Sequence, residues 1–187
     1  PHDVDFRKVR EIVAGLKLMP RLKAVALLVR FCLATGCRPG EARLLQWREV
    51  HSDRGICTLS QHKTSKATGA VRTIYLTKEA RETLRDAARM HGTAGYVFPS
   101  RRGNPYTASG FRHILTRNFK MTPYQLRHTF AQSALDTGMS IDDLGEWLGH
   151  TDASRRMTRV YAQVRSQRLL GVAKSLDGPM RLALSQS

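Results

Sequence analysis

The sequence predicts a mainly α-helical domain with a small antiparallel β-hairpin sheet, because its segments show two different apolar patterns. Residues 22–33 place apolar side chains at helical spacing, and Gly36 follows as a helix end. Residues 55–60 and 71–76 instead alternate apolar and polar side chains, and a polar loop joins them. We therefore expect a buried helix first and a β-hairpin after it.

The other segments are predicted to be helical, with one exception. Pro39 suits the first position of a short helix, on which Leu44 and Trp47 continue the apolar face. Further helices are expected from Thr77 to about Met90, over 107–119, over 124–137, after a Ser140 cap, and over 155–176, with 96–100 as a short extended piece. The predicted architecture is helices around one hairpin.

The helix over 124–137 has a marked beginning and end. Thr122, Pro123 and Gln125 form a Thr-x-x-Gln capping box with proline at the first helical position. Leu126, Phe130 and Ala134 form its apolar face, and Gly138 ends it. Arg127 then lies one turn from a capped helix N-terminus, where its guanidinium can reach a bound anion. A solvated surface arginine is the commoner alternative for such a residue taken alone.

Charge is the strongest feature of the composition. The 187 residues include 31 Lys and Arg against 15 Asp and Glu, a net charge of +16. This exceeds what solubility requires of one domain and points to a polyanionic partner, a membrane surface or nucleic acid. The chain has no long apolar run, no basic amphipathic helix and no signal peptide, so no membrane is expected and the protein is predicted to be intracellular.

Cysteine and histidine patterns predict no metal or cofactor. Cys32, Cys37 and Cys57 are odd in number and lack zinc-ligand spacing, so they are expected to be reduced packing residues. The seven histidines contain no H-x-x-x-H pair, and no glycine-rich phosphate loop is present. The predicted chemistry therefore uses side chains alone.

Residues 124–148 also suggest a helix-turn-helix, in which the second helix reads DNA. That helix presents Asp142, Asp143 and Glu146 and contains no Lys or Arg. Carboxylates repel the phosphates that a recognition helix must approach. Two core helices joined by a glycine turn are the better interpretation.

Five stretches in order carry a resemblance to a known family: "ATGCRPGEARLLQW", the lysine of "QHKT", "LRHTFA", "LGEWLGH" and "RVYAQV". Over Leu22 to Val164 the chain resembles the catalytic domain of tyrosine recombinases, the phage integrase family. The resemblance implies the catalytic fold shared with type IB topoisomerases over 1–187, without the separate N-terminal DNA-clamping domain. Starting at Pro1, the chain is expected to be a fragment or a processed product. The resemblance also implies that residues 165–187 form a C-terminal helix and tail, which can be exchanged with a neighbouring protomer.

The family pattern falls on particular residues. It implies that Arg38 and Arg127 bind the phosphate, that Glu41 supports Arg38, and that Tyr161 is the nucleophile. The remaining matches are a general acid at Lys63, a hydrogen-bond donor at His150, and Tyr124 in a supporting role where the family most often has histidine. Lys66, the alternative acid, and Arg72 are predicted to contact DNA.

These residue types suit phosphoryl transfer. Guanidiniums stay charged and bind phosphate oxygens bidentately, which stabilises the charge that develops in the transition state. A tyrosine hydroxyl can attack the phosphate, and an ammonium can protonate the leaving oxygen. Together with these residue types, the resemblance implies a site-specific DNA recombinase or integrase of a bacterium or phage, which works through a 3′-phosphotyrosyl intermediate without metal or ATP. It also implies double-stranded DNA as the partner, a homotetramer on that DNA, and a cytoplasmic protein associated with the nucleoid. The alternatives are a DNA-binding regulator without catalysis and a type IB topoisomerase-like relaxing enzyme.

Overall fold

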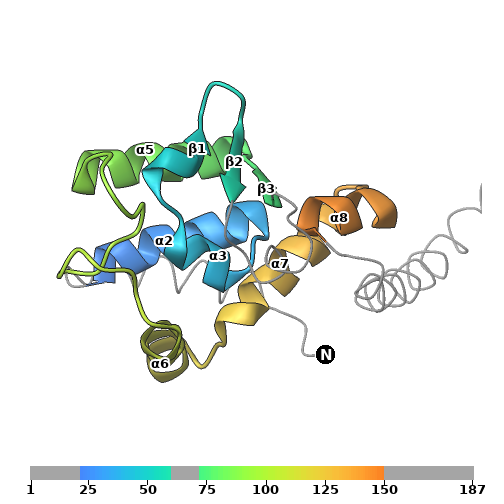
Figure 1. Cartoon of the computed structure of the whole chain (residues 1–187). Helices are drawn as coiled ribbons and strands as arrows, with labels where there is room; N and C mark the ends of the chain where they lie inside the picture. The colour runs from blue at the N-terminus through green and yellow to red at the C-terminus, as the bar shows by residue number, and fades with distance from the viewer. Residues whose placement is uncertain (1–21, 60–71, 150–187) are drawn as a thin grey trace, which may run out of the picture. The chain divides into compact units, whose positions relative to one another are not determined.

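The computed structural model describes residues 22–59 and 72–149 and divides the chain into two units, Pro1–Ala131 and Gln132–Ser187 (Figure 1). Helix α2 (Lys23–Thr35) lies in the core of the first unit. Ten residues of α2 are buried, as expected for a helix that is apolar nearly all round. It ends at Gly36, whose φ of 65° lies in the left-handed region that glycine adopts without a Cβ clash.

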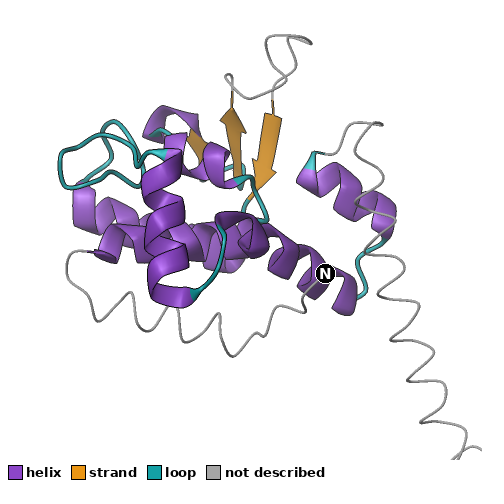
Figure 2. Cartoon of the chain, turned by 90° about the horizontal axis from the view of Figure 1, so that it is seen from below, coloured by secondary structure: helices purple, strands orange, loops and turns teal. Residues whose placement is uncertain are grey.

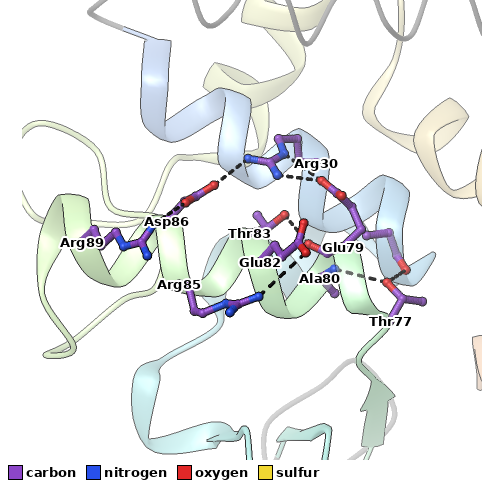
Figure 3. A network of polar contacts seen from close by, with 10 residues as sticks. Arg30, Thr77, Glu79, Ala80, Glu82, Thr83, Arg85, Asp86 and Arg89 are labelled. Carbon is purple, nitrogen blue, oxygen red and sulfur yellow. Dashed lines mark hydrogen bonds and ion pairs between the residues drawn. The ribbon is translucent and has the colours of Figure 1, made fainter.

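Helix α5 (Lys78–His91) packs against α2 (Figure 1). The Thr77 hydroxyl accepts a hydrogen bond from the Ala80 amide, so the predicted cap is confirmed. Arg30 of α2 links the two helices, because its guanidinium pairs with Glu79 at 2.6 Å and with Asp86 at 2.9 Å (Figure 3). These ion pairs bridge α2 and α5 where the two helices pack together.

The small sheet is antiparallel, with the order β1-β2-β3. It consists of β1 (Val50–His51), β2 (Ile56–Leu59) and β3 (Arg72–Tyr75), and Figure 2 shows the longer two as neighbouring orange arrows. The hairpin is confirmed, and β1 is an additional strand. The register pairs Leu59 with Arg72, and strand alternation places Arg72 on the buried face together with Ile74.

Two short elements connect α2 to the sheet. Helix α3 (Pro39–Leu44) follows α2 closely, and the 3₁₀ helix η2 (Trp47–Glu49) leads into β1. The predicted apolar face at Leu44 is wrong: Leu44 is exposed and Leu45 is fully buried. Because α3 ends at Leu44, Leu45 takes an extended conformation and no longer follows helical periodicity.

The stretch after α5 closes the core. The Val97 amide donates to the Leu45 carbonyl at 2.9 Å, and Tyr96 forms a β-bridge with Gln46, which confirms the extended piece. Phe98 is fully buried and its ring lies 5.3 Å from that of Phe31. Helix α6 (Ala108–Phe119) is capped by Thr107.

Helix α7 (Pro123–Asp136) begins in the first unit and continues into the second, and α8 (Ile141–Leu148) lies in the second. Gly138 between them has a φ of 98°. The prediction that Phe130 is buried needs correction, because Phe130 is half-buried and its neighbour Thr129 is buried instead. The acidic residues of α8 are exposed, which agrees with the prediction that this helix does not read DNA.

The mainly helical architecture with one small sheet is therefore as predicted. Within 22–59 and 72–149, no helix is both long and apolar enough to cross a membrane.

Replacing Phe31 by alanine should lower the free energy of unfolding by about 3–5 kcal/mol, because it removes a fully buried ring and its contact with Phe98. Urea unfolding followed by circular dichroism measures this change. Met90→Ala is the control, since Met90 is 43% exposed and should change stability by less than about 0.5 kcal/mol. Equal losses for the two variants would contradict the placement of the core.

Candidate active site

Arg38 and Glu41 form a reciprocal pair at the start of α3. The Arg38 amide donates to Glu41 Oε2 at 2.9 Å, and Arg38 Nη1 donates to Glu41 Oε1 at 2.8 Å. The local sequence explains this geometry, because Pro39 opens the helix and places Glu41 at its third position. The Glu41 side chain is buried, whereas that of Arg38 is 34% exposed. Arg38 is thus fixed in orientation and still open to a ligand.

Arg127 projects from the first turns of α7 into the protein. Its side chain is buried, and Nη1 donates to the Gly36 carbonyl at 2.8 Å. That carbonyl ends α2 next to Cys37 and Arg38, so the bond ties α7 to the segment that carries the first arginine. The start of α7 is fixed too, because Gln125 Oε1 accepts a hydrogen bond from the Thr122 amide at 2.7 Å.

Arg72 is the third guanidinium of this group. It begins β3, its side chain is 8% exposed, and its Nη1 donates to the Thr73 carbonyl at 2.6 Å. Its Nε lies 3.9 Å from Glu41 Oε1. A single carboxylate therefore faces both Arg38 and Arg72.

The arginines act on one another electrostatically. Burial lowers the pKa of Arg127, the nearby charges of Arg38 and Arg72 lower it further, and Glu41 raises it. The pKa of Arg72 is likewise lowered, first by burial and then by Arg38, and raised by Glu41. Because guanidiniums stay protonated in proteins, the group holds three cations against the carboxylate of Glu41. Such an excess of largely buried positive charge favours a bound anion.

Tyr124 and His128 lie beside Arg127 on α7. Their rings meet edge to face, with centroids 4.9 Å apart, and Tyr124 is 46% exposed. The Tyr124 phenol is therefore accessible to a ligand that approaches the arginines. The pKa of His128 is lowered by burial and by the charge of Arg127.

His128 should make the protein less stable in mild acid. Its pKa is lower in the folded chain than in the unfolded chain, so the unfolded chain binds more protons as the pH falls through about 6.5. Stability is therefore full above that pH and decreases below it. His128→Gln should reduce this decrease, measured by urea unfolding at pH values from about 5 to 8, which bracket the histidine titration. The same replacement at the exposed His113 is the control, and an unchanged slope for His128→Gln would contradict the prediction.

The thiols below the arginines are packing residues, as predicted. Cys32, Cys37 and Cys57 are free and buried. A hydrogen bond with Cys37 and burial raise the pKa of Cys32, and burial raises the pKa of Cys57 to about 12. These two thiols are not thiolates at neutral pH and are poor nucleophiles. Within 22–59 and 72–149, no three His, Cys, Asp or Glu side chains are grouped so that they could hold a metal ion.

The structure places five of the nine predicted site residues in this region: Arg38, Glu41, Arg72, Tyr124 and Arg127. Lys63, Lys66, His150 and Tyr161 lie outside the described residues. The burial of Arg72 was missed, because a basic residue next to a polar loop suggested a DNA contact. The alternation of Arg72, Ile74 and Leu76 was the available signal, because all three are buried.

Known proteins resemble the chain along most of its length. The model of the phage integrase family matches residues 3–168. A tyrosine recombinase XerC of Pediococcus pentosaceus is 28% identical over 90% of this chain and 58% of its own length. A XerC of Lacticaseibacillus casei is 30% identical over 87% of this chain and 57% of its own length. The chain thus spans a little over half the length of these relatives.

Solved structures support the same fold. A crystal structure of XerA recombinase superposes with a TM-score of 0.71 at 22% identity, covering 91% of this chain and 64% of that one. A lambda integrase tetramer bound to a Holliday junction superposes with a TM-score of 0.67 at 19% identity, covering 84% of this chain and 47% of that one. The predicted integrase-like catalytic fold is confirmed. The family match over residues 3–168, together with this fold, shows that the chain belongs to the phage integrase family.

Proposed function

We propose that the chain is the catalytic domain of a site-specific DNA recombinase that cuts and rejoins DNA through a covalent tyrosine intermediate. The observation that carries this proposal is the group of Arg38, Arg72 and Arg127 around Glu41. Two of these guanidiniums are almost fully buried, and the third is held by the shared carboxylate. A phosphodiester is an anion whose transition state gathers further charge on its non-bridging oxygens, so such a group suits it.

The proposed reaction is a transesterification. The Tyr161 hydroxyl loses its proton to water as its oxygen attacks the scissile phosphorus, a bond from phosphorus to the tyrosine oxygen forms, and the bond to the 5′-oxygen breaks. The leaving oxygen takes a proton from Lys63, while Arg38 and Arg127 bind the non-bridging oxygens. A 5′-hydroxyl of a second strand then gives its proton to Lys63 and attacks the phosphotyrosine, which restores the phosphodiester and releases Tyr161, whose oxygen takes a proton from water. Because bond energy is retained in the intermediate, the cycle needs no ATP.

Partners and location follow from this chemistry. The net charge of +16 suits double-stranded DNA, and the related lambda integrase structure is a tetramer on a Holliday junction. We accordingly propose a homotetramer on paired DNA sites in the cytoplasm of a bacterium or of a phage-infected cell. Exchange of residues 165–187 between protomers remains a prediction.

The proposal is tested by covalent trapping from a library. Each duplex of random sequence carries one nick at a fixed position. A cut a few base pairs from the nick releases a short 5′-hydroxyl fragment, which diffuses away and leaves the protein attached. The full chain is incubated with this library in a chelator and quenched with detergent, and the adducts are isolated and sequenced. We expect adducts that share a sequence and whose linkage maps to Tyr161 by mass spectrometry.

The captured sequence then separates the alternatives. Two plasmids that carry it should be joined by a recombinase, whereas a type IB topoisomerase-like enzyme would relax each plasmid without joining them. DNA binding without any adduct over the whole library would contradict the proposal and favour a non-catalytic regulator.

A further inference from the structure

Arg72 occupies a position that a DNA-contacting arginine rarely takes. Its side chain is 8% exposed on the core-facing side of β3, next to Ile74 and opposite Leu59. A basic residue that binds the DNA backbone normally keeps its charged head in water until the phosphate arrives. Burial of this charge is costly and requires a compensating partner.

Glu41 supplies a compensating negative charge for Arg72, and it also holds Arg38. Its Oε1 accepts the Arg38 Nη1 bond at 2.8 Å and lies 3.9 Å from Arg72 Nε, while its Oε2 accepts the Arg38 amide. The Glu41 side chain is 7% exposed. The two bonds to Arg38 hold the carboxylate from the helix side, and the charge of Arg72 attracts its Oε1 from the sheet side.

Arg72 is itself held firmly. Its Nη1 donates to the Thr73 carbonyl at 2.6 Å, so its guanidinium is fixed to the backbone of its own strand. The contacts of Arg72 with Glu41 and of Glu41 with Arg38 thus connect the β2-β3 pair to the most exposed of the three arginines.

We propose that Arg72 is a positioning residue, which orients the Glu41 carboxylate and through it the phosphate-binding guanidinium of Arg38. It does not contact DNA. The role rests on the proposed function for its effect on catalysis, but the geometric link exists in the chain without DNA and can be measured there. Arg72 acts on the cleavage rate and makes no phosphate contact that its replacement would remove.

The first experiment compares Arg72→Met with Arg30→Met in the full chain. Arg30 is a matched control, because it is also a largely buried arginine held by carboxylates, Glu79 and Asp86, but belongs to the α2-α5 contact (Figure 3). On the duplex captured from the library, Arg72→Met should lower the single-turnover cleavage rate by about 10- to 100-fold. Arg30→Met should leave that rate within about twofold even if its melting temperature falls more.

Affinity separates positioning from phosphate contact. A lost phosphate contact should reduce the slope of log K against log salt by about 0.9 on a random-sequence duplex. We expect an unchanged slope for Arg72→Met. A reduced slope with an unchanged cleavage rate would overturn the inference and restore a DNA contact.

A double-mutant cycle tests the route through Glu41. Because Arg72 acts by way of that carboxylate, the cleavage rate of the double variant Glu41→Gln/Arg72→Met should be reduced by a smaller factor than the product of the two single-variant factors. Arg72→Lys, which keeps the charge near Glu41, should recover part of the rate. Independent losses that multiply would contradict the inference.

One measurement does not depend on cleavage at all. The Arg38 Nε–Hε resonance, assigned with Arg38→Lys, should shift in Arg72→Met and stay in place in Arg30→Met. If the natural chain forms no adduct but this shift is seen, the proposed function fails and the positioning role stands. If the resonance does not move, the positioning role is wrong whatever the activity.

Discussion

Replacing Arg127 by lysine should lower the single-turnover cleavage rate by about 100- to 1,000-fold, the usual effect of losing one preorganised donor to a transition-state oxyanion. Lysine keeps the charge but loses the planar fork that can bind the Gly36 carbonyl and a phosphate oxygen at once. The rate is measured on the captured duplex with enzyme in excess, so that product release does not enter.

Stability shows whether Arg127 serves the reaction or the fold. Arg38 and Arg72 lower the pKa of Arg127, so they oppose its charge, and burial opposes it as well. Arg127→Met removes that charge together with the bond to the Gly36 carbonyl, so the free energy of unfolding should fall by about 1.5–3 kcal/mol, the usual contribution of a hydrogen bond to a charged group. A large loss of stability with little loss of cleavage would show a structural arginine and contradict the site.

Features set by neighbouring residues could be predicted from the sequence. The end of α2 at Gly36, the proline that opens α3 and the Thr77 cap depend on a few adjacent residues, and all are present in the structure. The pairing of Arg38 with Glu41 is also local, because the two residues are three apart on one helical turn. The resemblance then indicated what this pair is for.

Features that depend on distant segments were harder to predict. Leu45 is buried in place of Leu44 because the helix ends between them, and the Leu45 carbonyl accepts the hydrogen bond from the Val97 amide. The burial of Arg72 results from the pairing of β2 with β3 and from a carboxylate on α3. The bond from Arg127 to Gly36 joins α7 to the end of α2. No local pattern shows that three arginines from three elements meet around one carboxylate.

Tyr161→Phe is expected to abolish the covalent adduct completely, because phenylalanine lacks the oxygen that forms the bond to phosphorus. It should leave DNA affinity almost unchanged, since the arginines proposed to bind the phosphate are intact. The replacement removes one hydroxyl only, so the melting temperature of the two chains serves as the control for folding.

The decisive measurement is therefore the adduct yield of the natural chain and of Tyr161→Phe, side by side, on the same nicked duplexes in chelator after a detergent quench. An adduct with the natural chain and none with the variant would establish Tyr161 as the attacking group. An adduct of equal yield in both would show that another residue attacks, and would contradict the reaction proposed for this site.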